Sequence, residues 1–215
     1  MPLLRIAQLR GLAAYQDHGN IHFSDGRDAA RAAAVRDYLA DREQRPDASR
    51  VAVAQRRVDA RGINEGIRSE LQERGELAIG EESGEFTFQT DDGLRSFAAG
   101  DRLVFLENNR ELGVKNGMLG EVKAVEHDAI HVALDGASDR ADTRMIKVPM
   151  KDYQAVDHGY ATTIHKNQGA TVDRAFVLAS GTMDRHLTYV AMSRHRHDVQ
   201  LYGDAQEFAS RRGVS

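Results

Sequence analysis

The amino-acid sequence predicts an α/β protein whose parallel sheet is interrupted by a small all-β insert. At both ends of the chain, short apolar runs alternate with stretches of helical periodicity, as in a parallel sheet covered by helices. The middle of the chain carries short strands at regular spacing. The 215 residues, 41% hydrophobic and 29% charged, suffice for one compact domain with such an insert.

The first part of the chain alternates helix and strand. A helix is expected over residues 3–18 and a very short strand over residues 21–23. Ser24 or Asp25 is expected to cap a second helix that runs to about Ala40. A buried strand over residues 51–54 and a helix over residues 58–74 follow, the helix with apolar residues at four-residue spacing.

The middle of the chain predicts strands only. Phe86 and Phe88 alternate with polar residues, and Asp92 and Gly93 form a hairpin signal. Further strands are expected over residues 102–106, 119–125, 129–134 and 145–148. The α/β pattern resumes near residue 155, with strands over residues 172–179 and 198–202 and helices over residues 184–194 and 205–211.

A polar cluster stands directly before the buried strand at residue 172. His165, Lys166, Asn167 and Gln168 precede Gly169, and such side chains do little to stabilise an apolar core. Their hydrogen-bonding groups suit phosphates and bases. The cluster therefore indicates a site that holds a ligand or water.

Three motifs resemble those of a known family. ATTIHKNQG, residues 161–169, resembles motif V of superfamily 1 helicases of the RecD-like branch, and TYVAMSRHRHDVQLY, residues 188–202, resembles their motif VI. VAVAQRRVDARGIN, residues 51–64, is a weaker likeness to motif IV. The full order resembles the helicase part of Ti-type conjugative relaxases of the TraA kind. Motifs V and VI in the right order make the resemblance more specific than either alone.

The resemblance implies a fold and a division of the chain. It implies a RecA-like second motor domain, made of residues 1–84 and 153–215. Residues 85–152 would form an inserted small all-β barrel of the Src-homology-3-like kind. It also implies a helix over residues 157–168, which helix propensity alone leaves open.

The resemblance assigns roles around a nucleotide. Arg194 would act as the finger on the γ-phosphate of ATP, where a cation stabilises charge that develops during phosphoryl transfer. Gln168 and Gly169 would lie toward the nucleotide, and Arg57 or its neighbour Arg56 could reach a phosphate. The alternative for Arg194 is a surface arginine favoured by a helix C-terminus.

This chain departs from the family pattern beside that site. Many relatives carry Ser-Glu after the glycine of motif V, whereas this sequence has Ala170-Thr171. The departure puts nucleotide contacts beyond Gln168 in question.

The resemblance also assigns contacts to single-stranded DNA. Thr163, His165 and Lys166 would face the strand, with phosphates as the main partners. Further candidate contacts are Asn64, Asn108 and Asn109. The alternatives are a polar helix end in water for the first group, a solvated helix start for Asn64, and a simple turn at Asn116-Gly117 in the segment that follows Asn108 and Asn109.

Features that the sequence lacks narrow the chemistry. It has no GxxxxGK[ST] loop, so we expect ATP and Mg²⁺ to be bound mainly by a first motor domain outside this sequence. We expect this fragment to need no cofactor and to show no ATPase activity alone. Cysteine is absent and the histidines lack partners at ligand spacing, so no metal site is expected.

Two functions remain open. The first is the second motor domain of an ATP-dependent single-stranded-DNA translocase or helicase, moving 5′ to 3′, in a conjugative DNA-transfer relaxase. The alternative is a non-catalytic helicase-like module that binds DNA or a partner. Expected partners are single-stranded DNA, the first motor domain in cis and the conjugation machinery. No membrane segment and a cytoplasmic location are expected, and the net charge of −4 argues against tight nonspecific DNA binding by this part alone.

Overall fold

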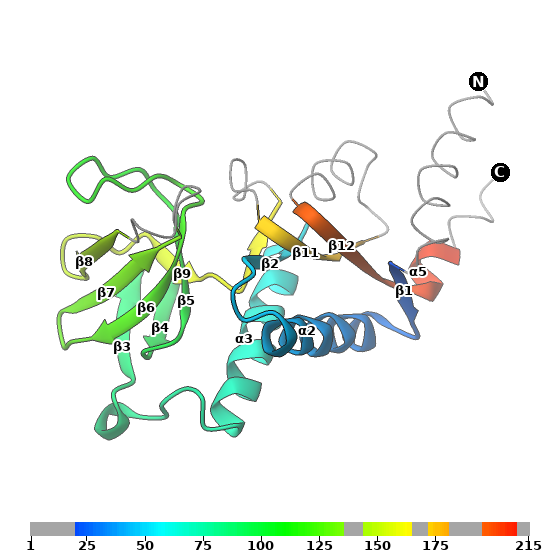
Figure 1. Cartoon of the computed structure of the whole chain (residues 1–215), viewed down its shortest axis with the longest axis horizontal. Coiled ribbons are helices and arrows are strands. Elements are labelled where there is room, and N and C mark those ends of the chain that lie inside the picture. Colours follow the sequence, from blue (N-terminus) through cyan, green and yellow to red (C-terminus); the bar gives the residue numbers. More distant parts are fainter. Residues whose placement is uncertain (1–19, 136–143, 165–171, 181–194, 210–215) are drawn as a thin grey trace. The chain divides into compact units, whose positions relative to one another are not determined.

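The computed structural model describes residues 20–135, 144–164, 172–180 and 195–209. The chain divides into two compact units (Figure 1). Unit 1 comprises residues 1–63 and 171–215, and unit 2 comprises residues 64–170. Within the described ranges, no helix is long and apolar enough to cross a membrane.

Unit 1 is built on a parallel sheet. Neighbouring strands run in the order β1 (Ile21–Ser24), β12 (His195–Asp204), β11 (Val172–Leu178) and β2 (Arg50–Ala54), and each pair is parallel. Val177 of β11 stands level with Val53 on one side and Leu201 on the other. Strand β2 is buried along its whole length, as expected where a parallel sheet is covered on both faces. The predicted α/β class with a parallel sheet is therefore confirmed.

Helices follow the strands of unit 1. Helix α2 (Arg27–Gln44) buries an alanine-rich face, and its Tyr38 ring lies 5.5 Å from the ring of Phe176 on β11. Its N-cap is Gly26 with a φ of 95°, so the predicted cap at Ser24 or Asp25 is wrong. Glycine adopts such a positive φ without steric cost. Helix α3 (Arg57–Glu73) follows β2, and α5 (Ala205–Ala209) follows β12.

Unit 2 is all-β beyond α3. A 3₁₀ turn, η1 (Glu81–Ser83), precedes a hairpin of β3 (Phe86–Thr90) and β4 (Gly93–Phe97). The hairpin predicted from Asp92 and Gly93 is confirmed within one residue: the chain turns at Asp91 and Asp92, and Gly93 opens β4 with a φ of 102°. An antiparallel sheet follows in the order β8 (Met145–Pro149), β7 (Ala129–Leu134), β6 (Leu119–Val125), β5 (Arg102–Phe105) and β9 (Val156–His158).

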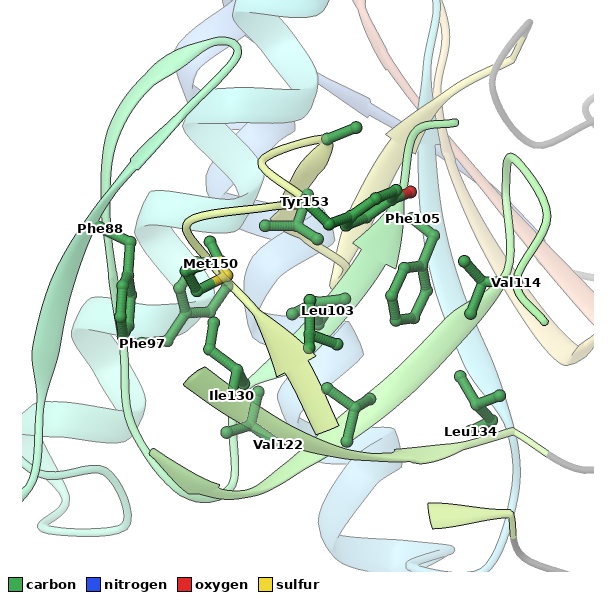
Figure 2. Packing of buried hydrophobic residues seen from close by; sticks show 14 residues of the cluster. Phe88, Phe97, Leu103, Phe105, Val114, Val122, Ile130, Leu134, Met150 and Tyr153 are labelled. Carbon is green, nitrogen blue, oxygen red and sulfur yellow. The ribbon is translucent and has the colours of Figure 1, made fainter. Parts of the chain in front are cut away.

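The core of unit 2 gathers large side chains from the hairpin and the sheet (Figure 2). Phe97, Leu103 and Phe105 are fully buried, and Val122 and Ile130 pack in the same cluster. The neighbours of these residues in β5 and β7 are largely buried as well, so both strands lie in the interior along most of their length. Their burial supplies the main stabilising term for this unit.

The expected helix over residues 157–168 is wrong for the residues that the structure describes. Residues 156–158 form β9, and β10 (Ala161–Thr163) follows after a tight connection. Strand β9 pairs with β5, so long-range pairing and β-branched residues such as Val156 outweigh the implied helix. Residues 165–168, and the helices expected over residues 3–18 and 184–194, lie outside the described ranges.

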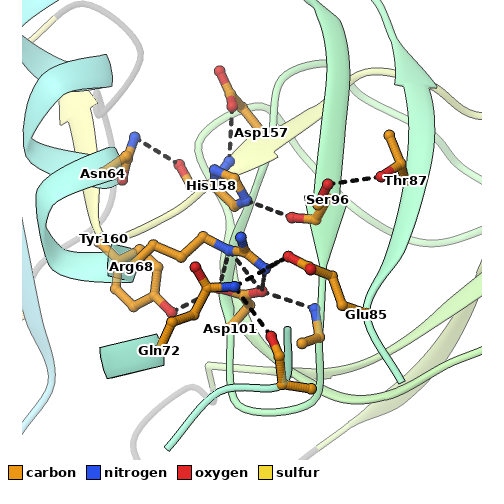
Figure 3. Close-up of polar contacts among 12 residues, drawn as sticks. Asn64, Arg68, Gln72, Glu85, Thr87, Ser96, Asp101, Asp157, His158 and Tyr160 are labelled. Carbon is orange, nitrogen blue, oxygen red and sulfur yellow. Dashed lines mark hydrogen bonds and ion pairs between the residues drawn. The ribbon is translucent and has the colours of Figure 1, made fainter. Parts of the chain in front are cut away.

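A buried carboxylate joins α3 to the strands of unit 2 (Figure 3). Asp101 is fully buried, and its oxygens accept hydrogen bonds from Arg68 Nε at 3.1 Å, Tyr160 Oη at 2.8 Å and the Ala98 N–H at 2.8 Å. Arg68 also donates to Glu85 at 2.7 Å. A buried charge is tolerated only when it is paired and hydrogen-bonded, so this set of bonds fixes α3 against the hairpin and the β9–β10 connection.

Gly159 leaves no room for a side chain. A Cβ built there would lie 2.6 Å from the backbone carbon of Leu103. We expect Gly159→Ala to lower the free energy of unfolding by about 1–3 kcal/mol, because the backbone at residue 159 must move away from the backbone of Leu103. Urea denaturation checks this, with Ser69→Ala on the exposed face of α3 as the control that stays near wild type. An unchanged midpoint for Gly159→Ala would contradict the close approach.

His158 makes the stability of unit 2 depend on pH. Its Nε2 donates to the carbonyl of Ser96 at 2.8 Å, and burial lowers its pKa despite the nearby Asp101 carboxylate. The unfolded chain then binds a proton below about pH 6.5 that the folded chain resists, so stability is lost as the pH falls from there.

We expect the loss of unfolding free energy between pH 7 and pH 5.5 to be smaller in His158→Gln than in wild type. Denaturation curves at the two pH values measure this. The exposed His127→Gln should keep the wild-type difference, and equal differences in all three proteins would rule out His158 as the source.

Candidate nucleotide and DNA interface

The carboxyl ends of the strands in unit 1 meet at one edge of the sheet. Gln55, Arg56 and Arg57 follow β2 directly, and Ala179 and Ser180 follow β11. Ligands of open α/β sheets usually bind at this edge. The side chains there are therefore the first candidates for a nucleotide contact.

Asp59, in the first turn of α3, holds two arginines at this edge. Its Oδ1 accepts hydrogen bonds from Arg27 Nε at 2.9 Å and from Arg56 Nη2 at 3.1 Å. Its Oδ2 accepts hydrogen bonds from Arg27 Nη2 at 2.5 Å and from Arg56 Nε at 2.7 Å. Asp59 is only 2% exposed. Burial by itself raises its pKa, but the hydrogen bonds from Arg27 and Arg56 hold the pKa at about 2. The carboxylate therefore stays ionised and orients both arginines.

Arg56 is a fixed cation that remains accessible. Its side chain is 48% exposed, and the hydrogen bond to Asp59 raises its pKa. Two of its five N–H groups are used by Asp59, no other residue in the described part of the chain accepts a hydrogen bond from its guanidinium, and Glu207 adds a weaker attraction to its charge. An arginine with a fixed fork and free N–H groups suits a phosphate oxygen.

Arg57 stands beside it in a different state. Arg57 is exposed and makes no hydrogen bond or ion pair with the residues that the structure describes. It can reach a ligand, but nothing described orients it. The sequence predicted both arginines as phosphate contacts but not the Asp59 clamp, by which we mean Asp59 with its bonds to Arg27 and Arg56. The i, i+3 spacing of Arg56 and Asp59 at a helix start does indicate such a pair. Nothing in the sequence pattern indicates Arg27 as the second partner, because it lies 32 residues from Asp59.

Asn64 is placed where it does not offer a DNA contact. Its side chain is 5% exposed, and its amide bonds to the backbone of His158 (Figure 3) and to that of Ala161. Both amide N–H groups are used, so the expected DNA contact is replaced by a structural role. Thr163, at the end of β10, is also buried at 8% exposed.

Asn108 and Asn109 lie in the connection between β5 and β6. Asn108 Oδ1 accepts the N–H of Asn116, and Asn109 Oδ1 accepts the N–H of Leu112, both at 2.9 Å. The bond to Asn116, together with the positive φ of 85° at Gly117, fits the turn expected at Asn116-Gly117. Asn108 is exposed, so its amide group stays available to a ligand.

The remaining predicted site residues lie outside the described ranges. They are His165, Lys166, Gln168, Gly169 and Arg194. Their roles stay predictions.

Comparisons with known proteins find similarity to segments of conjugal transfer proteins. It is 45% identical over 190 residues to "Probable conjugal transfer protein TraA" of Sinorhizobium fredii and 47% identical over 187 residues to "Conjugal transfer protein TraA" of Agrobacterium fabrum. These matches cover 87% and 86% of this chain but only 16% of each relative. "Multifunctional conjugation protein TraI" of Escherichia coli is 33% identical over 56% of this chain and 7% of its own length. No protein-family model matches.

Solved helicases share the fold. The Pif1 helicase from Bacteroides in complex with ADP-AlF3 and ssDNA has a TM-score of 0.51 and 22% identity, covering 83% of this chain and 49% of that one. Pif1 at forked dsDNA gives a TM-score of 0.51 and 23% identity, covering 83% and 47%. The chain is thus homologous to one segment of the TraA proteins and has a helicase-like α/β fold, and the predicted resemblance is confirmed.

The Asp59 clamp predicts a large effect of a small change. Asp59→Asn leaves two arginines beside a neutral amide, and we expect a loss of about 3–5 kcal/mol in the free energy of unfolding because a buried pair loses its anion. Asp28→Asn, where the side chain is 88% exposed, is the matched control and should change stability by about 0.5 kcal/mol or less. Guanidinium denaturation of both variants measures this, and equal effects would refute the clamp.

Proposed function

We propose that this chain, a homologue of one segment of the TraA conjugal transfer proteins, is the second motor domain of an ATP-dependent single-stranded-DNA translocase. One observation carries the proposal: a half-exposed Arg56, fixed by a buried Asp59, stands at the carboxyl edge of a parallel sheet in a chain with this homology. Such a cation suits a nucleotide phosphate. The 5′-to-3′ direction comes from the family resemblance alone.

The proposed roles extend to the rest of the site. Arg194 acts as the γ-phosphate finger, while Gln168, Gly169 and Arg57 contact the nucleotide. ATP and Mg²⁺ are bound mainly by a first motor domain elsewhere in the full-length protein, so this chain alone is inactive as an ATPase. The all-β part of unit 2 is the inserted Src-homology-3-like barrel. The protein works in the cytoplasm with the conjugation machinery.

DNA is the second ligand of the proposal. His165 and Lys166 lie in the short stretch that resembles motif V and contact single-stranded DNA there, next to the buried Thr163. A stretch between two ligands lets a change at the phosphate alter the grip on DNA. The conjugal-transfer names of the relatives support DNA as the partner.

A non-catalytic module is the second candidate. Ala170 and Thr171 stand where many members of the resembling family have Ser-Glu, and this change favours a domain that binds DNA or a partner without hydrolysis. Such a module has no need of a finger at Arg194.

Arg194→Ala in the full-length protein separates the two functions. We expect DNA-stimulated ATP turnover to fall about 10³-fold or more, the range known for such arginines. Arg196→Ala is the control, because its side chain is half exposed and pairs only loosely with Asp173 at 3.5 Å in the described part of the chain. Unchanged turnover in Arg194→Ala would favour the non-catalytic module.

A further inference from the structure

Four charged side chains form a continuous chain of contacts at the carboxyl edge of the sheet in unit 1. Arg27 donates from Nε and Nη2 to Asp59, at 2.9 and 2.5 Å, and from Nη1 to Glu207 Oε2 at 2.9 Å. Arg56 donates to the same Asp59 carboxylate. The order of contacts is therefore Glu207, Arg27, Asp59 and Arg56, and all four residues belong to unit 1.

Other bonds join the start of α2 to the start of α5. The N–H of Gly26 donates to Asp204 Oδ1 at 3.3 Å, and Gln206 Nε2 donates to Asp25 Oδ1 at 2.9 Å. These bonds lie in the turns that precede the two helices, so Glu207 is held where it meets α2.

The exposure of the four side chains differs along the chain of contacts. Asp59 is 2% exposed and Arg27 is 17% exposed, whereas Glu207 is 31% and Arg56 is 48% exposed. Each of the three guanidinium nitrogens of Arg27 donates to a carboxylate, so Arg27 acts on its neighbours and not on a ligand. The groups that a ligand can reach are the Arg56 cation and the Glu207 carboxylate.

Arg27 and Asp59 neutralise each other, which leaves the charge of Arg56 available to a ligand. Without Arg27, the buried Asp59 carboxylate would cancel the charge of Arg56 instead. The carboxylate of Glu207 opposes an anionic ligand. The pKa of Arg56 is raised first by its hydrogen bond to Asp59 and less by the negative charge of Glu207, so Glu207 lies close enough to act on Arg56.

We propose that Arg27 and Glu207 set the phosphate affinity of the Arg56 site with opposite signs: Arg27 is a positioning residue that strengthens binding, and Glu207 weakens it. The inference rests on the proposed function, because it takes the phosphate chain of a nucleotide as the ligand at Arg56. If the four residues only held the helices together, neutralising Glu207 would cost a little stability and leave nucleotide affinity unchanged.

The experiment measures the dissociation constant of a fluorescent, non-hydrolysable ATP analogue for the full-length protein, at about 0.1 M and about 1 M salt. At the lower salt we expect Glu207→Gln to bind about threefold more tightly than wild type, because one negative charge near the phosphates is removed. At the higher salt, where the Debye length is about 3 Å, the gain should vanish. A gain in affinity cannot come from a loss of fold.

Glu43→Gln is the matched control, since it removes the same charge at the other end of α2. Glu43 is exposed and lies about 24 Å from Arg27 along the helix, at about 1.5 Å per residue. That separation is more than two Debye lengths at the lower salt, so the control should bind like wild type. The inference is overturned if Glu207→Gln binds no more tightly than Glu43→Gln, or if its gain persists at the higher salt.

Variants of Arg27 test the opposite sign. We expect Arg27→Gln to bind the analogue about tenfold more weakly at the lower salt, because the Asp59 charge is then left to Arg56 alone. Arg27→Lys keeps the charge but not the fork of donors, so it should recover part of the loss. Wild-type affinity in Arg27→Gln would overturn the inference.

Arg56→Gln separates this inference from the proposed function. If Arg56→Gln binds the analogue as wild type does, the phosphate contact that carries the proposed function is refuted, and the inference fails with it. If Arg56→Gln weakens binding while Glu207→Gln stays at the wild-type affinity, the phosphate contact stands and only the inference is wrong.

Discussion

Unit 2 depends on the buried carboxylate of Asp101. Its charge is removed from water completely, and the structure compensates with Arg68, the Tyr160 hydroxyl and a backbone N–H. Burial would lower the pKa of Arg68, but the carboxylates of Asp101 and Glu85 raise it, so the guanidinium stays charged. Because these groups come from α3, the hairpin and the β9–β10 connection, the strands of unit 2 cannot shift against α3 without exposing an unpaired buried charge.

Unit 1 also contains a buried carboxylate that binds arginines, but there one arginine remains accessible to solvent. Asp59 is as well buried as a core residue and also organises arginines, but one of them reaches the surface. Arg68 is 11% exposed and its neighbours surround it, whereas Arg56 is 48% exposed and keeps three N–H groups without a described partner. The first arrangement stabilises a fold. The second holds a cation ready for a ligand without the entropy loss of ordering it on binding.

The sequence predicted elements whose signal is local. The apolar runs of β2 and β11, the four-residue spacing of α3 and the Asp92-Gly93 turn all appear where expected. Apart from the cap of α2, which is Gly26, the errors involve partners distant in sequence. Strand β9 pairs with β5 about fifty residues earlier, and the amide of Asn64 bonds to residues 94 and 97 positions away. Contacts between distant residues produce no periodic pattern in the sequence. The sequence therefore did not predict that Asn64 is buried.

The strand order of unit 1 has a consequence for synthesis of the chain. Strands β1 and β2 are made early, but the strands between them, β12 and β11, come after the whole of unit 2. At about 5–20 residues per second, the ribosome needs roughly 6 to 30 seconds after β2 to supply them. Unit 2 is continuous in sequence and complete by residue 170, so its sheet can close first. Until then the apolar strand β2 has no neighbour from unit 1, and nascent chains stalled before residue 172 would be the form most exposed to chaperones and proteases.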